Sequence, residues 1–438
     1  MITNKKIGVI SLGCDKNRVD TEKMLATLSQ RHVLTDDINS AEIIIINTCA
    51  FIEPARKEGI TEILGAGELK LNGNLEKLIV TGCIPQKYAK EIFEELKEVD
   101  AFLGVSDYDK ILDVIDGVYF GERINAVGCT KLETQTKRVL TTNGYAYLKI
   151  ADGCNNHCTY CTIPSIRGRY RSIPKERLIE EAIGLGEVEE LILVAQDVTK
   201  YGVDLEEKTN LVSLIQDLSK LDNVKRIRLL YCYPESITDE LIAEISDNAK
   251  VVKYLDIPLQ HASDRILKLM NRKGSGQDYL TLINRLKTQV KGIALRSTFI
   301  TGFPTETDED FETLLDFINK SKFFNVGFFK YNKEDGTPAG KMQGQVSAKI
   351  KTQRYKKLYS TQKRVVKENA KQLIGSTVEV FAEGFDENEM IYYGRAYFNA
   401  PDIDGKVYFF SSDEVEYGKV YKVKLLKASE YDFYGERL

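Results

Sequence analysis

The sequence has no apolar run long enough to span a membrane. Its longest apolar runs, such as residues 43–46, are far shorter than the roughly 20 residues that a membrane-spanning helix needs. The amino terminus also lacks the basic start, apolar stretch and cleavage site of a signal peptide. Of the 438 residues, 43% are apolar and 29% are charged, as is typical of globular proteins. We therefore expect a soluble, cytoplasmic protein without a membrane partner.

The chain also lacks an excess of positive charge. Its net charge of −4 argues against a protein that simply coats nucleic acid, although a local basic patch is still compatible with RNA contact. Eight cysteines in a cytoplasmic protein are not expected to form disulfides, so a metal-binding or catalytic use is the better interpretation. The length predicts about two to four domains.

Three of the cysteines lie in one short polar loop. Cys154, Cys158 and Cys161 form a CxxxCxxC pattern directly after the strand-like run 145–150. Three thiolates can hold three irons of a cubane cluster and leave the fourth iron open to a substrate. Structural zinc sites instead close four ligands, usually with two CxxC pairs or paired histidines, and His157 alone does not complete such a pattern. Three unrelated buried thiols would need an apolar surrounding that this loop does not provide.

Three further cysteines occupy equivalent positions in the first part of the chain. Cys14, Cys49 and Cys83 each follow a run that we expect to be a strand, and helical patterns such as 18–30 and 85–97 come next. The expected strands are residues 6–12, 42–47 and 77–81. This alternation predicts a Rossmann-like parallel α/β domain, in which the carboxyl ends of the strands share one edge. One cysteine there would be a routine core residue, but three predict a second three-thiolate cluster site.

The segment CNNHCTYC, residues 154–161, resembles the CxxxCxΦC signature of the radical S-adenosylmethionine (SAM) enzymes, with Tyr160 directly before the last cysteine. The resemblance implies that the open iron chelates the amino and carboxyl groups of SAM and that the reduced cluster cleaves SAM to a 5′-deoxyadenosyl radical. With two cluster sites, the chain resembles the methylthiotransferases of this superfamily. Their amino-terminal domain carries three dispersed cysteines, and a radical SAM barrel and a small TRAM domain follow. One cluster then produces the radical and the other presents sulfur.

Strands and helices alternate again from residue 145 to about residue 332. The expected strands are residues 145–150, 190–194, 226–231, 252–257, 294–300 and 326–331. Six βα units fit the partial (β/α)6 TIM-type barrel of the superfamily better than a full eight-unit barrel. Functional residues should then lie at the carboxyl ends of the strands.

Several residues at these strand ends are candidate ligands of SAM. By resemblance, Gln196 and Asp197 follow the strand that commonly contacts the SAM amino group, and Gly302 follows a later strand, so we expect SAM contacts at Tyr160, Gln196, Asp197 and Gly302. A functional and a structural role are equally open for Asp256, Gln260 and His261. Arg167, Arg169 and Arg171 either approach the SAM carboxylate or the substrate, or form a solvated basic face. No role is assigned to Cys129, and Cys232 is expected to be a buried structural thiol.

The last part of the chain changes character. Residues 349–371 form a basic helical pattern with nine Lys or Arg and one acid, which suits either phosphate contact or a solvated connecting helix. Short runs at 377–382, 392–398, 407–410 and 420–426 then predict a small antiparallel β-barrel, in agreement with a TRAM domain. Residues 370–438 contain eight Lys or Arg and thirteen Asp or Glu. Such an acidic barrel suits a basic protein partner better than RNA.

The segment ISLGCDKNRVDTEKML, residues 10–25, is similar to the RimO family rather than to the YGCQMN-type start of the transfer RNA (tRNA) methylthiotransferases. QDVTKYG (196–202), LDIPLQHAS (255–263) and DGTPAG (335–340) extend the resemblance over essentially the whole chain. It implies methylthiolation of the β-carbon of an aspartate in ribosomal small-subunit protein twelve. The implied cofactors are SAM and two 4Fe–4S clusters, held by Cys14, Cys49 and Cys83 and by Cys154, Cys158 and Cys161.

Two other functions stay open at this point. One is methylthiolation of a tRNA adenosine, which the basic helix would favour, and the other is a non-catalytic iron–sulfur protein that binds the ribosome. An electron donor such as flavodoxin or ferredoxin is expected for the enzymatic functions. The expected domains are an α/β domain at 1–120, a linker at 121–140, a radical SAM core with its connecting helix at 141–370 and a TRAM domain at 371–438.

Overall fold

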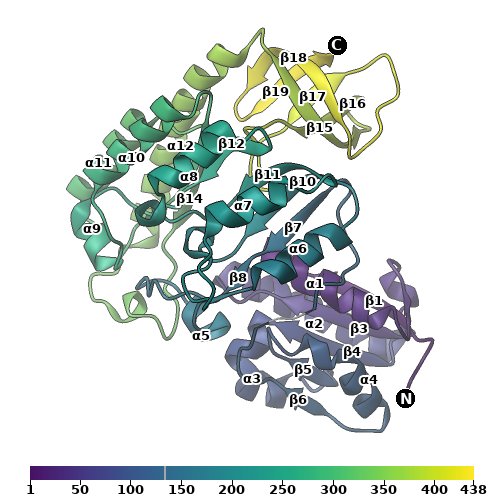
Figure 1. Cartoon of the computed structure of the whole chain (residues 1–438). Coiled ribbons are helices and arrows are strands. Elements are labelled where there is room, and N and C mark those ends of the chain that lie inside the picture. Colours follow the sequence, from purple (N-terminus) through teal and green to yellow (C-terminus); the bar gives the residue numbers. More distant parts are fainter. Residues whose placement is uncertain (133–134) are drawn as a thin grey trace.

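The computed structural model describes residues 1–132 and 135–438, which form two large parallel sheets followed by a small closed barrel (Figure 1). Residues 133–134 of the predicted linker lie outside the described residues. None of the described helices combines the length and the apolar composition that a membrane crossing requires. The predicted multidomain α/β fold class is confirmed.

The first sheet has six parallel strands in the order β2-β1-β3-β4-β5-β6. Its strands are β1 Lys6–Ser11, β2 Val33–Leu34, β3 Ile43–Thr48, β4 Lys77–Gly82, β5 Ala101–Leu103 and β6 Ile124–Ala126. Its helices are α1 Asp15–Leu28, α2 Glu53–Asn72, α3 Cys83–Glu95 and α4 Ile111–Tyr119. All of β3 is buried, as expected of a central parallel strand that is covered on both faces. The Rossmann-like arrangement agrees with the prediction.

Strand β6 lies inside the segment 121–140, which the sequence predicts to be an irregular linker. The structure instead pairs β6 in parallel with β5 at the edge of the first sheet. The three residues of β6 are too few for an alternating pattern to stand out, so the strand depends on pairing with its neighbour. The domain boundaries themselves stay predictions.

The second sheet has six parallel strands in the order β14-β13-β12-β11-β10-β7 and does not close. Its strands are β7 Tyr145–Lys149, β10 Val188–Val194, β11 Val224–Leu229, β12 Val251–Asp256, β13 Ala294–Thr301 and β14 Asn325–Lys330. A short ribbon joins β8 Ala151–Asp152 to β9 Arg171–Ser172. These six strands are the six that the sequence predicts, within two residues at each end, and the partial barrel is confirmed.

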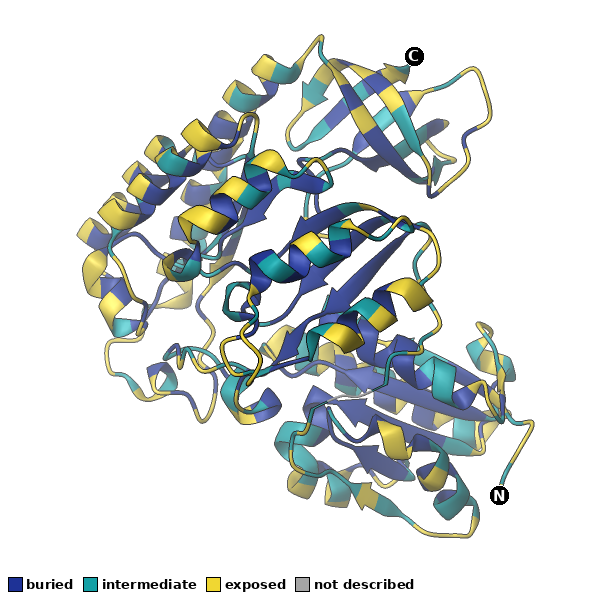
Figure 2. Cartoon of the chain, in the orientation of Figure 1, coloured by how far each residue is buried: buried dark blue, intermediate teal, exposed yellow. Residues whose placement is uncertain are grey.

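Helices cover the outer face of this open barrel, and their exposed residues point away from the sheet (Figure 2). The helices of this part are α6 Lys175–Gly184, α7 Leu211–Ser219, α8 Asp239–Asp247, α9 Asp264–Leu269, α10 Gly276–Gln289, α11 Asp308–Ser321 and α12 Ala348–Leu373. The short α5 Ile163–Arg167 instead lies against the first sheet, where Ile166 joins the apolar core. The long α12 leads toward the carboxyl-terminal barrel (Figure 1).

The carboxyl-terminal barrel is closed, in the order β15-β16-β17-β19-β18. Its strands are β15 Thr377–Asp386, β16 Ile391–Arg395, β17 Val407–Phe410, β18 Val420–Ser429 and β19 Asp432–Arg437. The pairing departs from the predicted antiparallel barrel at one place, because β17 and β19 pair in parallel. That pair closes the barrel, and the sequence pattern gives no sign of β19 because the strand is mostly polar and contains a glycine.

The inner face of the open barrel is filled by the other two parts of the chain. Tyr147 and Tyr254 of this face belong to one apolar cluster with Val19 of α1 and with Phe398 and Phe409 of the small barrel. The concave side of the second sheet therefore packs against α1 on one side and against the small barrel on the other.

Buried ion pairs reinforce the contact between the small barrel and the second sheet. Arg395 of β16 lies 2.7 Å from a carboxylate oxygen of Glu190 on β10, and Glu190 also pairs with Arg228. A second pair joins Arg296 of β13 to Asp404 of the small barrel at 3.2 Å. Burial raises the pKa of the Glu190 carboxyl, but the charges of Arg228 and Arg395 outweigh it and lower the pKa to about 2. Glu190 is therefore a buried carboxylate that depends on both cations.

We predict that Arg395→Met lowers the free energy of unfolding by about 3 kcal/mol, because the buried carboxylate of Glu190 keeps Arg228 but loses its second cation, and Glu383 loses its pair with Arg395. Urea titration followed by circular dichroism measures the change. Arg177→Met is the control, since the ion pair of Arg177 with Glu180 is exposed and its loss should cost less than about 1 kcal/mol. Equal losses in the two variants would show that the buried pair does not stabilise the interface.

Candidate metal centres

The first cysteine trio lies at one edge of the first sheet. Cys14 caps the amino end of α1 directly after β1, Cys49 follows β3, and Cys83 is the first residue of α3 after β4. Because β1, β3 and β4 are adjacent parallel strands, their carboxyl ends bring these three residues to the same place. The structure thus gathers the cysteines as the sequence predicts, while their role as ligands stays a prediction.

Glycines allow the close approach of the strand ends in this trio. Gly13 and Gly82, which precede Cys14 and Cys83, have φ values of +89° and +94°. A Cβ atom at Gly13 would stand 2.6 Å from the Cβ atom of Cys49, and one at Gly82 would stand 2.3 Å from the side-chain oxygen of Asn47. Larger residues would therefore force the cysteine-bearing turns apart.

The thiols of this trio are partly withdrawn from water. Cys49 and Cys83 are buried and Cys14 is half-buried. Burial, followed by the charges of Cys83 and Cys14, raises the pKa of the Cys49 thiol to about 12. Burial also raises the pKa of the Cys83 thiol, although the charge of Arg167 opposes this shift. Metal ligation requires thiolates, so a metal group bound here would have to lower these raised thiol pKa values.

The second trio lies on the loop between β8 and α5. Gly153, with a φ of +78°, lets the loop turn beside the backbone of Arg169, where a Cβ atom would stand 2.1 Å from the carbonyl oxygen. The backbone N–H of Asn156 lies 3.4 Å from the sulfur of Cys154, and the N–H of Ile163 lies 3.5 Å from that of Cys161. Burial raises the pKa of the Cys161 thiol to about 12, with the Ile163 N–H opposing it.

Tyr233 and Arg272 complete the surroundings of this loop, and the sequence does not predict either. The hydroxyl group of Tyr233 lies 2.8 Å from the sulfur of Cys158, and the guanidinium of Arg272 lies 3.9 Å above the ring of Tyr233. Both residues come from loops beyond strands of the second sheet, so only the three-dimensional fold brings them to the cysteines.

The role of both trios as ligands of iron–sulfur clusters stays a prediction. Among the described residues, no three His, Cys, Asp or Glu side chains are close enough together to hold one metal ion. A cubane places each thiolate on a different iron, so its ligands stand further apart than the ligands of one zinc ion.

Two of the predicted SAM ligands lie beside the second trio. Gln196 donates to the carboxylate of Asp152 at 3.1 Å, and Asp197 accepts from the side-chain amide of Asn156 at 3.0 Å. The amide oxygen of Gln196 is buried and has no hydrogen-bond partner among the described residues. It is therefore an acceptor that a bound ligand can satisfy.

Tyr160 and Gly302 lie near a small apolar cluster that includes Phe303 and Met270. Tyr160 packs against this cluster, and Gly302 directly precedes Phe303. The N–H of Gly302 donates to Glu306 at 2.7 Å, and its φ of +75° suits a turn. A structural role accounts for these contacts of Gly302, and its contact with SAM stays a prediction.

The polar residues after β12 have structural partners. Asp256 pairs with Arg296 at 3.0 Å, and the fully buried His261 accepts from the N–H of Ser263 at 3.0 Å. The backbone of Gln260 bridges to β13. These contacts give Asp256 and the Nδ1 atom of His261 structural partners, while a functional role for His261 and for the side chain of Gln260 stays open. Cys129 is exposed and Cys232 is buried, as expected of residues outside the two trios.

The structure corrects the prediction for Arg167. The sequence suggests a SAM or substrate contact or a solvated basic face, but Arg167 is only 2% exposed. Its guanidinium lies 2.9 Å from Asp20 on α1 and 3.0 Å from Asp152 on β8. It also donates to Asn17 at 2.6 Å and lies 4.0 Å from the sulfur of Cys83. Arg169 is exposed, which agrees with a solvated basic face, and its contact with SAM or the substrate stays a prediction.

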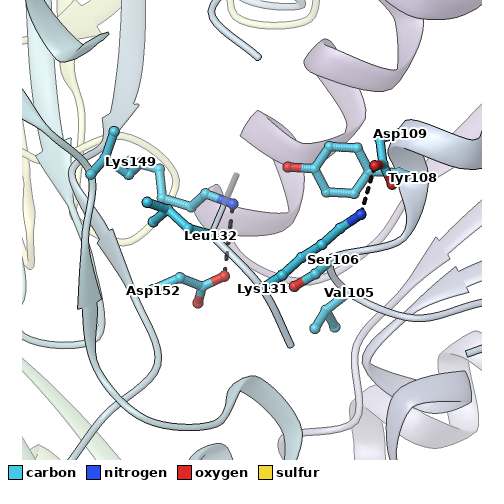
Figure 3. A pocket seen from close by; sticks show the side chains of 9 residues that line it. Val105, Ser106, Tyr108, Asp109, Lys131, Leu132, Lys149 and Asp152 are labelled. Atoms are coloured by element: carbon cyan, nitrogen blue, oxygen red, sulfur yellow. Dashed lines mark hydrogen bonds and ion pairs between the residues drawn. The ribbon is translucent and has the colours of Figure 1, made fainter. Parts of the chain in front are cut away.

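A cavity of about 230 Å³ lies between the first sheet and the second (Figure 3). Two ion pairs stand on opposite sides of it, Lys149 with Asp152 at 3.8 Å and Lys131 with Asp109 at 2.6 Å. Burial raises the pKa of the Asp152 carboxyl, but the charges of Arg167 and Lys149 hold it below the ordinary value. Both sides of the cavity therefore carry charged side chains that are paired within their own part of the chain.

Comparison with known proteins assigns each part of the chain to a family model. Residues 148–318 match the radical SAM superfamily, residues 6–104 match the uncharacterized protein family UPF0004, and residues 374–438 match the TRAM domain. Solved structures agree at the level of the fold. The radical S-adenosylmethionine methyltransferase TsrM from Kitasatospora setae is 13% identical, with a TM-score of 0.58 over 77% of each chain. The cobalamin-dependent radical enzyme OxsB gives 0.54 at 14% identity, over 83% of this chain and 56% of that one.

Curated relatives match over almost the full length. The ribosomal protein uS12 methylthiotransferase RimO of Lachnoclostridium phytofermentans is 48% identical over 98% of this chain and 99% of its own length. The protein of the same name from Clostridium kluyveri is 46% identical over 98% and 97%, and that from Thermoanaerobacter sp. is 45% identical over 99% and 100%. This chain is a methylthiotransferase with a radical SAM core, and it belongs to the RimO family of these enzymes.

Proposed function

We propose that this enzyme methylthiolates the β-carbon of an aspartate in ribosomal small-subunit protein twelve, in the cytoplasm. The observation that carries the proposal is the 45–48% identity, over nearly the whole chain, to methylthiotransferases named for ribosomal protein uS12. An electron donor such as flavodoxin or ferredoxin is required, because SAM is cleaved reductively.

Two 4Fe–4S clusters and SAM are the proposed cofactors. Cys14, Cys49 and Cys83 would hold one cluster, and Cys154, Cys158 and Cys161 would hold the other. When bound, the second cluster supplies the reductive cleavage of SAM and the first supplies the sulfur atom, while another SAM supplies the methyl group. Each trio leaves one corner of a cubane without a protein ligand, which is the corner that the chemistry uses.

The protein residues around the second trio position SAM. The unpaired amide oxygen of Gln196 is a suitable acceptor for the ammonium group of SAM. Asp197 holds Asn156 and thereby fixes the cluster loop at the end of β10. Tyr160 packs the same loop against the apolar cluster around Phe303. These contacts orient the ligand and limit the access of water.

Charge favours a basic protein over RNA as the partner of the carboxyl-terminal barrel, which carries thirteen acids and eight basic residues over 370–438. The cations of α12, which motivate the tRNA alternative, are partly engaged. Arg354 pairs with Glu306 and Asp308, Lys357 with Glu312, and Lys363 with Glu430. A connecting helix with its own counter-charges fits this pattern, so RNA contact is secondary.

We predict about eight irons per chain in the reconstituted enzyme, as two cubanes require. Cys49→Ala should reduce this to about four and abolish methylthiolation, yet keep the cleavage of SAM. Cys158→Ala should also leave about four irons, but without SAM cleavage. Iron and sulfide analysis together with detection of 5′-deoxyadenosine measures both effects.

Cys232→Ala is the matched control for these variants. Cys232 is buried, and it should keep about eight irons because it belongs to neither trio. About four irons in the unaltered protein would contradict the amino-terminal cluster.

We also predict that purified enzyme with SAM and dithionite replaces one hydrogen of protein twelve by a methylthio group. Mass spectrometry of the protein and of its peptides measures the change, and an Asp→Asn substitution of the modified residue should abolish it. Modification of a tRNA adenosine with no change in the protein would instead support the tRNA function. SAM binding without 5′-deoxyadenosine would support a non-catalytic protein.

A further inference from the structure

One buried guanidinium, that of Arg167, connects the two cysteine trios. Helix α5 begins two residues after Cys161 and ends at Arg167. The Nη1 atom of Arg167 lies 3.0 Å from the carboxylate of Asp152, which is two residues before Cys154. The other oxygen of that carboxylate accepts from the N–H of Gly153 at 2.8 Å. Arg167 therefore holds the cluster loop of the second sheet from both ends.

The same side chain reaches the first trio through Asn17. The Nη2 atom of Arg167 donates to the amide oxygen of Asn17 at 2.6 Å and lies 4.0 Å from the sulfur of Cys83. The amide nitrogen of Asn17 donates to the carbonyl oxygens of Leu12 at 3.0 Å and Thr48 at 2.9 Å. Leu12 directly follows β1, which leads to Cys14, and Thr48 ends β3, which leads to Cys49. Arg167 and Asn17 together thus contact the chain at every cysteine of the first trio.

The geometry of these contacts requires arginine. A guanidinium is a planar fork with donors in fixed directions, whereas a lysine ammonium is a point charge on a flexible stem. The nearby Lys149 pairs with Asp20 and Asp152 and so supplies charge there, but the contacts with Asn17 and Cys83 belong to Arg167. Since Arg167 is buried, solvent and salt do not weaken its interactions.

We propose that Arg167 is a positioning residue for sulfur transfer, which fixes the separation and orientation of the two cysteine trios. This inference rests on the two-cluster function proposed above. SAM cleavage needs only the trio of the second sheet, whereas sulfur transfer needs both trios at the correct separation and orientation. A misplacement of about 1 Å between reacting groups can cost about a hundredfold in rate. Loss of the Arg167 guanidinium should therefore lower product formation while SAM cleavage continues.

The test uses Arg167→Lys in the reconstituted holoenzyme, with protein twelve as the substrate. The variant keeps a positive charge between Asp20 and Asp152, so it should fold, bind iron and cleave SAM. The yield of methylthiolated product per 5′-deoxyadenosine should fall about tenfold or more. Arg177→Lys is the control, because the ion pair of Arg177 with Glu180 is exposed on α6, and this variant should keep the unaltered yield.

A spectroscopic measurement makes the test independent of the folding of the variant. In the unaltered, fully reduced enzyme, the fixed spacing predicts a magnetic interaction between the two clusters in electron paramagnetic resonance spectra, which disappears in Cys49→Ala. Arg167→Lys should change the size of this interaction while the iron content stays the same. A change of that kind reports on cluster geometry and not on stability.

Two results would overturn the inference. One is an unaltered ratio of product to 5′-deoxyadenosine in Arg167→Lys, and the other is the absence of any interaction between the clusters of the unaltered enzyme. Either result leaves the iron content and the product of the unaltered enzyme as they are. Failure of the proposed two-cluster function would give other results, namely about four irons per chain or no methylthiolated protein.

Discussion

The architecture depends on one constraint, which is that the carboxyl ends of adjacent parallel strands must lie at the same edge of a sheet. In the first sheet, this constraint brings together Cys14, Cys49 and Cys83, which lie more than thirty residues apart in the sequence. Glycines with positive φ at positions 13 and 82 then let the turns approach one another. No local motif is required, because the topology of the sheet brings these three cysteines together. In the second part of the chain, a compact CxxxCxxC loop has the same effect.

A second constraint is the open edge of the partial barrel. An open six-stranded sheet leaves its concave face without the layer that a closed barrel would provide, and here α1 and the carboxyl-terminal barrel fill it. Apolar packing supplies the main free energy of this contact, whereas buried pairs such as Arg395 with Glu190 are sensitive to small displacements. The three parts are therefore held in one relative position by charges whose partners lie in different parts of the chain.

The sequence predicted the elements better than the contacts between them. The six strands of the partial barrel, strands β1, β3 and β4 of the first sheet and the positions of both cysteine trios follow from periodicity and spacing, which are local properties. Strands β2, β5, β6 and β19 and the parallel pairing of β17 with β19 were missed, because strands this short or this polar depend on pairing with their neighbours. The role of Arg167 was missed for a related reason. Its partner Asp20 lies 147 residues away, and an isolated arginine after a cluster loop gives no sign of such a contact.

The position of Arg167 on α5 gives its contacts a wider consequence. A helix of five residues is too short to be stable by itself, so its orientation is imposed by what holds its two ends. At its start, the N–H of Ile163 points to the sulfur of Cys161, and at its end Arg167 is fixed by Asp20 and Asp152. Between them, Ile166 packs into the apolar core of the first sheet. A displacement of the cluster loop therefore also moves the interface with the first sheet. The two cysteine trios consequently move together.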